Sequence, residues 1–173
     1  MNPYLYQENN TSSRGDHIKI YTIGVYGRTE TDFFKNLVEY SITLFVDIRA
    51  RRGMRGAKYS FVNSTYLQER LKELNIKYLH IRDLAPSREA RDQQREDDKL
   101  LGINKQARHS LSRSFIERYR DECLSHFDLA TFIRQFEDEN LVFFCVEREP
   151  EACHRGIVAD ELSQLGIKVH HIR

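Results

Sequence analysis

Residues 141–155 read LVFFCVEREPEACHR, and this stretch decides the fold class of the chain. It starts with an apolar run that is typical of a strand buried on both faces. Within a few positions it passes into a helix, which begins either at Pro150, a favoured first-turn residue, or nearer to Cys153. A buried strand that leads directly into a helix is typical of α/β proteins, which place chemistry at such a junction.

The same alternation of strand and helix extends over the rest of the chain. We expect strands over 18–23, 42–48, 76–81, 141–147 and 167–172, and helices over 29–40, 63–74, 114–124, 128–136 and 153–165. Residues 88–99 are charged or amide residues apart from one alanine, so they form either a solvated helix or a mobile loop. The pattern predicts a three-layer α/β fold with a mostly parallel sheet of about five strands flanked by helices, and with a helical insertion between strands three and four.

The composition is that of one folded domain, which we expect to span 17–173 after a flexible N-terminal arm over 1–16. The chain has 173 residues, of which 40% are hydrophobic and 31% charged, and its net charge of +1 points to no particular partner. No run approaches the ~18 apolar residues of a membrane span, and an apolar signal core is absent, so we expect a cytoplasmic protein without a membrane partner. Three cysteines are too few for a disulfide scaffold, which predicts reduced thiols.

Polar residues follow the ends of the predicted strands. Gly24 ends the first strand, Asp47 and Arg49 the second, and Cys145 and Glu147 the fourth. Because the carboxyl ends of parallel strands share one edge of the sheet, where ligands bind, we expect these residues to meet in one pocket. Asp47 and Arg49 either line that pocket or form an ion pair that closes the strand. Cys145 alone fits a buried packing residue, whereas Glu147 directly after an apolar strand needs a partner or a function.

Cys153, His154 and Arg155 occupy the first turns of the last helix. A helix N-terminus carries unpaired N–H groups and a partial positive charge, which bind anions, and Arg155 adds a fork that suits phosphate. The same environment favours the thiolate of Cys153, which makes it a better candidate nucleophile than Cys145. The C-x7-C-H spacing is not a recognised zinc signature, so we expect neither a metal nor a cofactor.

A basic loop over 49–58 leaves the end of the second strand. Beyond Arg49, its cations are Arg51, Arg52, Arg55 and Lys58. Such a loop fits contact with a phosphate backbone, with Tyr59 or Phe61 for base stacking. A solvated loop whose aromatic residues pack on the core is an equal alternative. Other cations that extend the basic surface, if they fold near it, are Lys105, Arg108 and His109.

Four sequence blocks carry a resemblance to a known family. They are Tyr21-Thr22-Ile23-Gly24, Phe45-Val46-Asp47-Ile48-Arg49, Ile76-Lys77-Tyr78-Leu79-His80-Ile81, and a final block of Cys145, Glu147, Pro150 and Cys153-His154-Arg155 followed by Ala159-Asp160. Over 18–172 the chain resembles the domain of unknown function 488 family. The resemblance implies a compact α/β domain whose polar pocket contains Thr22, Gly24, Asp47, Arg49, Cys145, Glu147, Cys153, His154 and Arg155. This chain departs from the family pattern at 25–27 and 82–86, so the resemblance does not define that edge of the pocket.

Three classes of function are compatible with these residues. The first is an enzyme that acts on a nucleotide or a nucleic-acid component, with Glu147 or Asp47 as general acid or base and Cys145 or Cys153 as a candidate nucleophile. The second is a noncatalytic nucleic-acid-binding module that uses the basic loop. The third, a thiol redox or sulfur-transfer protein, is the least favoured because the chain contains no C-x-x-C motif. We favour the first, with a phosphate-bearing small molecule or a nucleic acid as its partner.

Overall fold

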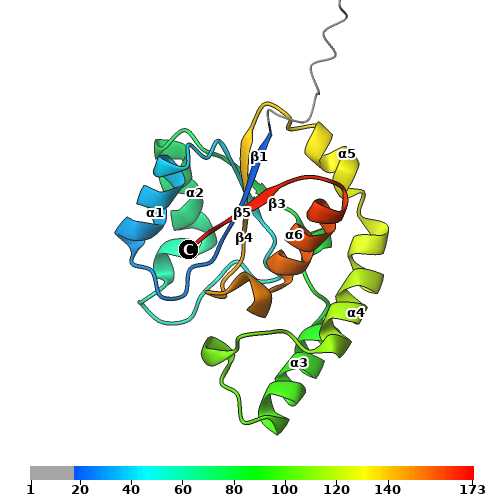
Figure 1. Ribbon diagram of the computed structural model, residues 1–173. Coiled ribbons are helices and arrows are strands. Elements are labelled where there is room, and N and C mark those ends of the chain that lie inside the picture. The colour runs from blue at the N-terminus through cyan, green and yellow to red at the C-terminus, as the bar shows by residue number, and fades with distance from the viewer. Residues whose placement is uncertain (1–17) are drawn as a thin grey trace, which may run out of the picture.

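The computed structural model describes residues 18–173, and in this part of the chain five strands form one parallel sheet (Figure 1). The expected N-terminal arm lies outside the described residues. The strands are β1 (Lys19–Ile23), β2 (Leu44–Asp47), β3 (Lys77–His80), β4 (Asn140–Phe144) and β5 (Val169–Ile172). Their order in the sheet is β3-β2-β4-β1-β5, so that β4 lies at the centre between β1 and β2. The predicted three-layer α/β fold is confirmed.

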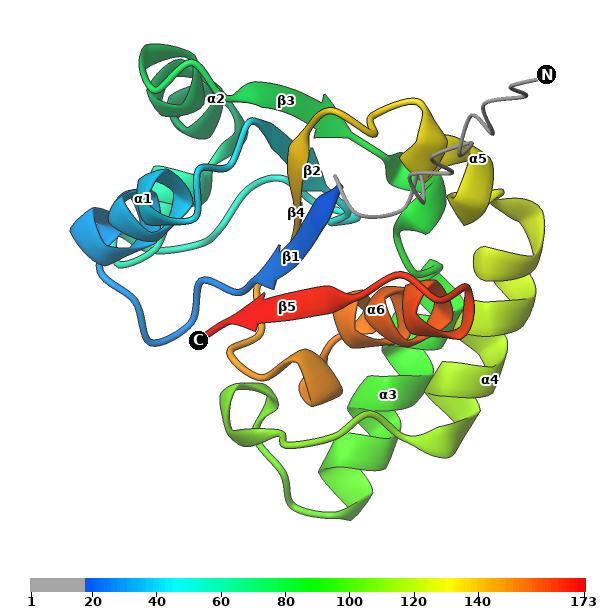
Figure 2. The ribbon, with the colours of Figure 1, turned by 45° about the horizontal axis from the view of Figure 1, so that its top comes forward.

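Helices cover both faces of the sheet, as Figure 2 shows. They are α1 (Glu30–Glu39), α2 (Ser64–Glu73), α3 (Arg88–Leu100), α4 (Arg113–Glu122), α5 (Leu129–Arg134) and α6 (His154–Gln164). Helices α1 and α2 pack on one face, whereas α4, α5 and α6 pack on the other. None of the helices in the described residues has the length and apolar character that a membrane span requires.

The central strand shows why an unbroken apolar run forms here. Phe143 packs toward α5, with its ring centroid 6.4 Å from that of Phe132. Phe144 points to the opposite face and lies 5.5 Å from Phe33 of α1 and 5.1 Å from Phe45 of β2. Successive side chains of a strand alternate between faces, and both faces of this sheet are covered, so the four buried positions of β4, residues 141–144, are all apolar.

Strand β4 is shorter than the predicted strand over 141–147, because it ends at Phe144. Beyond this point the chain leaves the sheet, and the carbonyl of Val146 accepts hydrogen bonds from the backbone N–H groups of Val25 (3.2 Å) and Tyr26 (3.0 Å). Cys145 and Glu147 therefore belong to a loop, which corrects the expectation that they lie within the end of the fourth strand. The loop after β1 and the loop after β4 are joined through their backbones.

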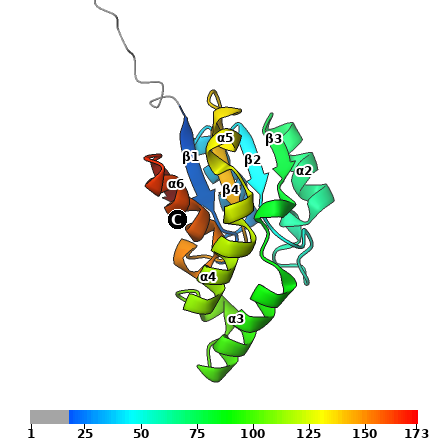
Figure 3. The same ribbon diagram turned by 90° about the vertical axis from the view of Figure 1, so that its right-hand side faces the viewer.

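Residues 88–99 form a helix, which is the first of the two predicted alternatives. Ala90, Gln94 and Asp98 of α3 are buried and are spaced four residues apart, so they form one face of the helix. Gln94 accepts a hydrogen bond from the backbone N–H of Ser112 (2.9 Å) and donates one to Asp98 (2.8 Å). The buried stripe of α3 is thus mainly polar, and this helix packs beside α4 (Figure 3).

Gly156 lets the first turn of α6 approach the short 3₁₀ turn Pro150–Ala152. A Cβ atom at Gly156 would lie 2.2 Å from the carbonyl oxygen of Pro150, which is backbone and has little freedom to move. The absence of a side chain at this position therefore determines how closely the start of α6 packs on the segment that precedes it.

Gly156→Ala should lower the free energy of unfolding by about 1–3 kcal/mol, the usual cost of overpacking, despite the better helix propensity of alanine. Urea unfolding monitored by circular dichroism measures the change. Gly53→Ala is the matched control, because no atom lies within 4 Å of its added Cβ, and its stability should change by less than about 1 kcal/mol. Equal stability of the two variants would contradict the packing described for α6.

Candidate functional site

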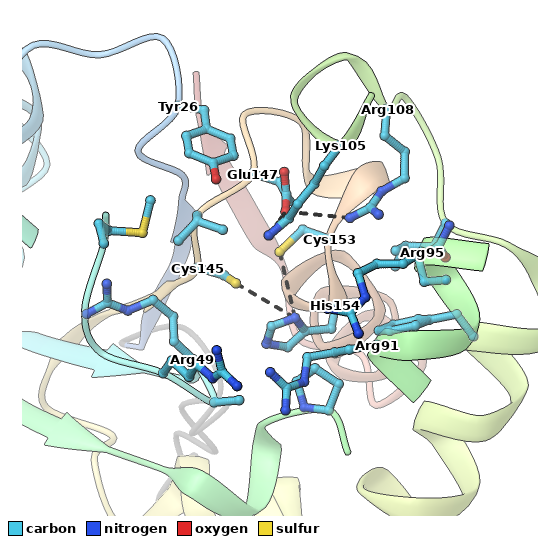
Figure 4. A pocket seen from close by; sticks show the side chains of 18 of the residues that line it. Tyr26, Arg49, Arg91, Arg95, Lys105, Arg108, Cys145, Glu147, Cys153 and His154 are labelled. Carbon is cyan, nitrogen blue, oxygen red and sulfur yellow. Dashed lines mark hydrogen bonds and ion pairs between the residues drawn. The ribbon is translucent and has the colours of Figure 1, made fainter. Parts of the chain in front are cut away.

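A cavity of about 310 Å³ lies beyond the carboxyl ends of β2 and β4 (Figure 4). Among the described residues that line it, Glu147 supplies the only carboxylate, whereas six of the side chains are cationic. These are Arg49, Arg51, Arg91, Arg95, Lys105 and Arg108. The site is therefore strongly basic, although the whole chain has a net charge of only +1.

Four segments that are distant in the sequence build most of the cavity, and the loop after β1 adds Tyr26. The loop after β2 supplies Arg49 and Arg51, and the loop after β4 supplies Cys145 and Glu147. The start of α6 adds Cys153 and His154. The remaining wall comes from the insertion between β3 and β4, in which α3 carries Arg91 and Arg95 and the following loop carries Lys105 and Arg108. The insertion thus faces the carboxyl edge of the sheet and contributes four of the six cations.

Glu147 is buried, with 5% of its surface exposed, and interacts with two cations through one oxygen. Its Oε1 lies 3.3 Å from Nζ of Lys105 and 3.5 Å from Nη2 of Arg108. Burial raises the pKa of the Glu147 carboxyl, an effect that Lys105 and Arg108 oppose and the neighbouring Cys153 reinforces. Burial alone would lower the pKa of Lys105, but the charge of Glu147 raises it. A carboxyl group with a raised pKa is suited to proton transfer near neutral pH.

Arg108 is held rigidly beside Glu147. Its Nη1 donates to Oδ2 of Asp98 at 2.8 Å, and its Nη2 donates to the carbonyl of Ala152 at 3.1 Å. The buried amide of Gln94 fixes Asp98 in turn. The polar stripe of α3 therefore positions a cation against the one carboxylate of the cavity.

Two buried nitrogen atoms on cavity-lining arginines have no hydrogen-bond partner among the described residues. They are Nη1 of Arg49, whose side chain is 3% exposed, and Nε of Arg108, whose side chain is 7% exposed. Buried donors are almost always satisfied in folded proteins, because an unpaired donor loses its hydration without compensation. Neither atom is exposed to water, so an acceptor in the cavity reaches it only after a shift of the arginine side chain.

Two thiols and an imidazole meet at the inner end of the cavity, as Figure 4 shows. Nδ1 of His154 lies 3.7 Å from Sγ of Cys145 and 3.9 Å from Sγ of Cys153, and all three residues are buried. Nε2 of His154 lies 2.9 Å from the carbonyl oxygen of Ile48. Because a carbonyl oxygen only accepts, Nε2 carries the hydrogen of this bond, and Nδ1 presents its lone pair to the sulfur atoms in the neutral ring.

The two thiols differ in acidity. Burial raises the pKa of Cys145 well above the usual value of a thiol, and its contact with Cys153 adds to this effect. Burial would also raise the pKa of Cys153, but the hydrogen bond from Cys145 and the positive charge of Arg155 oppose it, and the pKa is lowered. Of the two, Cys153 is thus the thiol that ionises first.

The predicted pair Asp47 and Arg49 forms a buried ion pair at the end of β2. The guanidinium donates to both carboxylate oxygens of Asp47, at 2.9 and 2.7 Å, and Tyr78 donates to Oδ2 at 2.9 Å. The Arg49 guanidinium also lies over the ring of Phe144, 4.6 Å from its centroid. Arg49 lines the cavity, whereas Asp47 does not. This geometry matches the alternative of an ion pair that closes the strand.

Arg155, expected to hold phosphate, instead holds the loop that carries Glu147. Its Nη1 donates to the carbonyl of Glu147 at 2.6 Å and its Nη2 to the carbonyl of Arg148 at 2.8 Å, and the residue is 1% exposed. Gly24 lies against the same loop, because a Cβ there would come within 1.8 Å of the Glu147 carbonyl oxygen. Neither residue lines the cavity. Both position the loop after β4 through its backbone.

Thr22 and Tyr59 also lie outside the cavity lining. The hydroxyl of Thr22 is 2.8 Å from Nδ1 of His171, at the β1–β5 side of the sheet. Tyr59 is buried, accepts a hydrogen bond from the backbone N–H of Gly27 and packs 5.2 Å from the ring of Tyr26. Its ring is therefore packed on the core, which corresponds to the second of the two alternatives for the basic loop.

The basic loop is exposed at each of its four predicted nucleic-acid contacts, Arg51, Arg52, Arg55 and Lys58. Of these only Arg51 lines the cavity. From the sequence, Lys105 and Arg108 were candidate cations whose position relative to the pocket was not predicted. Arg91 and Arg95 were not among the predicted site residues. The available signal was the absence of an aliphatic stripe over residues 88–99, which left the arginines of this helix free to face a polar cavity.

The comparisons with known proteins identify a family. The sequence profile of the family described as "Domain of unknown function DUF488" matches residues 30–162, which is more than half of the chain, and the chain belongs to this family. The matched range includes the segments that build the cavity and excludes β1 and β5. No curated protein and no solved structure matches the chain.

Arg155→Met should lower the free energy of unfolding by about 3 kcal/mol, because two charge-assisted hydrogen bonds to buried carbonyls are lost and each contributes roughly 1.5–3 kcal/mol. Arg95→Met is the control, because Arg95 is exposed and its loss should cost less than about 0.5 kcal/mol. Urea unfolding compares the two variants. A stable Arg155→Met protein would mean that the guanidinium does not hold the loop after β4.

Proposed function

We propose that this protein is an enzyme that binds a small phosphate-bearing ligand, a nucleotide or a nucleic-acid component, in the cavity beyond the carboxyl ends of β2 and β4. The observation that carries the proposal is the charge of the lining, in which six cationic side chains accompany one carboxylate. Five of the six are arginines, whose planar forks match the oxygen atoms of phosphate groups.

The unpaired nitrogen atoms strengthen the case for an anion. Nη1 of Arg49 and Nε of Arg108 are buried donors without a protein acceptor in the described chain, and both side chains line the cavity. A phosphate group supplies several acceptor oxygens together with negative charge. It therefore offsets the repulsion among the arginines, and it pairs with the two donors once their side chains shift toward it.

The size of the cavity favours a small ligand over a polymer. Its volume of about 310 Å³ is at the lower end of the range of small-molecule sites, which is roughly 300–1,000 Å³. Arginines from α3 and from the loop after β2 line opposite parts of the same space, with Arg95 and Arg51 among them. A ligand that inserts one phosphate-bearing end into this space fits better than a strand that passes through it.

Glu147 makes the site suitable for catalysis. It is the only carboxylate of the lining, its pKa is raised, and it lies beside two cations that can stabilise developing negative charge. Glu147 acts in this proposal as the general acid or base on a substrate whose phosphate is bound by the arginines. Asp47 takes no part in the proposal, because its carboxylate is used by Arg49 and Tyr78.

A second candidate function is nucleic-acid binding by the exposed basic loop. The observation in its favour is the exposure of Arg51, Arg52, Arg55 and Lys58, all on one loop at the side of the cavity. Binding of this kind weakens steeply as salt rises. Arg52→Ala/Arg55→Ala would then reduce the salt dependence of binding to a short oligonucleotide, without affecting the binding of a mononucleotide in the cavity.

Arg91→Ala and Arg95→Ala should each weaken binding of inorganic phosphate and of nucleoside phosphates by roughly tenfold, the equivalent of about 1.4 kcal/mol. Isothermal titration calorimetry measures the dissociation constants. Arg88→Ala is the matched control, because Arg88 and Arg95 lie on the same helix and both pair with Asp92, but only Arg95 lines the cavity. Equal affinities for wild type, Arg95→Ala and Arg88→Ala would exclude the cavity as the anion site.

Glu147→Gln should reduce turnover by at least about 100-fold, since general acid–base catalysis contributes ~10²–10⁴ in rate. Nucleotide binding should remain, because the arginines are unchanged. Turnover is measured as consumption of ribo- and deoxyribonucleoside phosphates by liquid chromatography with mass detection. Glu149→Gln, in the same loop but outside the cavity lining, is the control. Unchanged turnover in Glu147→Gln would remove this carboxyl from the mechanism.

A further inference from the structure

We propose that Cys145, Cys153 and His154 form a zinc-binding site at the inner end of the cavity. The sequence predicts no metal, because their spacing matches no zinc signature. The fold nevertheless brings one ligand atom of each residue within 4.8 Å of the other two. The loop after β4 and the start of α6 meet at this point, so residues eight positions apart in the chain become neighbours.

The distances fit a tetrahedral ion. Zinc binds cysteine sulfur at about 2.3 Å and histidine nitrogen at about 2.0–2.1 Å, so two such ligands at the tetrahedral angle are about 3.6 Å apart. Nδ1 of His154 lies 3.7 Å from Sγ of Cys145 and 3.9 Å from Sγ of Cys153. Both nitrogen–sulfur distances are therefore within a few tenths of an ångström of those in a tetrahedral zinc site, and the two sulfur atoms lie within 4.8 Å of each other.

The contacts that His154 makes on the side away from the sulfur atoms support the zinc site independently of the distances. Metal-binding histidines almost always donate their second ring N–H to a carboxylate or a backbone carbonyl, which fixes the tautomer and the ring orientation. Nε2 of His154 makes this contact with the carbonyl of Ile48, immediately after β2. The ring also packs against Tyr119, with the centroids 5.4 Å apart. The lone pair of Nδ1 is thus held toward the two sulfur atoms.

The ligand set selects the kind of metal. Two thiolates and an imidazole favour zinc over magnesium or calcium, which prefer oxygen ligands. Two thiolates also neutralise the double charge of the ion, so the complex adds no net charge beside the arginines of the cavity. Zinc binding releases the thiol protons of Cys145 and Cys153 to solvent and changes no oxidation state.

Three protein ligands leave one position of a tetrahedral ion for another group. The group found among the described residues contains these three ligands, and all three residues line the cavity. This arrangement is typical of catalytic zinc sites, which keep a position for water or substrate, and not of structural sites with four protein ligands. The zinc site itself does not depend on the proposed function. Only the identity of the fourth ligand, water or a phosphate oxygen, rests on it.

Metal titration of the chelator-treated, reduced full chain tests the site. With zinc as the probe, we expect one equivalent to bind, measured by elemental analysis after desalting. With cobalt as the probe, we expect a thiolate-to-cobalt charge-transfer band and the visible bands of a tetrahedral ion. Cys153→Ser and Cys145→Ser should each weaken zinc binding by more than about 100-fold. Loss of a residue that only supports a zinc ligand weakens metal binding by about 10–100-fold, so a larger loss identifies a direct ligand. Cys123→Ser is the control, because Cys123 is buried but lies outside the group.

Absence of stoichiometric zinc in the wild-type chain, or a wild-type cobalt spectrum without thiolate bands, would overturn the proposal without reliance on any variant. Unaltered zinc affinity in folded Cys153→Ser protein would do the same, as would oxidation of Cys145 and Cys153 to a disulfide that zinc does not prevent.

Arg95→Ala separates the zinc site from the proposed phosphate site, because this variant should lose phosphate affinity and keep its zinc. Zinc binding without phosphate binding in the wild type would contradict only the proposed function.

Discussion

The arrangement of the cavity depends on the hydrogen bonds that Arg155 donates to the loop after β4. This buried guanidinium reaches from the first turn of α6 to the carbonyls of Glu147 and Arg148, at 2.6 and 2.8 Å. Gly24 allows the loop after β1 to lie against the same carbonyl of Glu147. A cation that is paired only with backbone oxygen keeps its charge, and this charge favours the thiolate of Cys153 nearby.

The parallel sheet explains why the remaining polar groups converge. Central strand β4 lies between β2 and β1, so the loops that leave β2 and β4 are neighbours at the carboxyl edge. The insertion between β3 and β4 then covers this edge with a helix whose buried face is polar. Gln94 and Asp98 on that face position Arg108. The same helix also carries Arg91 and Arg95, which line the cavity.

The amino-acid pattern was sufficient for the fold, because apolar runs such as 141–144 identify strands that are covered on both faces. It placed the end of β4 too late, since the departure of the chain at Cys145 depends on hydrogen bonds to Val25 and Tyr26, which are distant in sequence. It located Cys145, Glu147, Cys153 and His154 at the cavity for the right topological reason.

The roles of single residues were harder to predict than their locations. A sequence does not reveal whether a buried arginine pairs with a ligand or with the protein, and Arg155 and Arg49 are both held by protein oxygen atoms. Local periodicity also left residues 88–99 undecided between a helix and a loop, because hydrogen bonds and not aliphatic contacts bury Gln94 and Asp98. The group of Cys145, Cys153 and His154 depends on the return of the chain after β4, which no spacing rule contains.

The measurement that tests the central claim most directly is a crystal structure of the protein soaked with tungstate, an analogue of phosphate that scatters X-rays anomalously. The account predicts an anomalous peak inside the cavity, within hydrogen-bonding distance of the guanidinium groups that line it, such as those of Arg91 and Arg95. An empty cavity beside peaks on the exposed loop 51–58 would contradict it and would favour surface binding of nucleic acid.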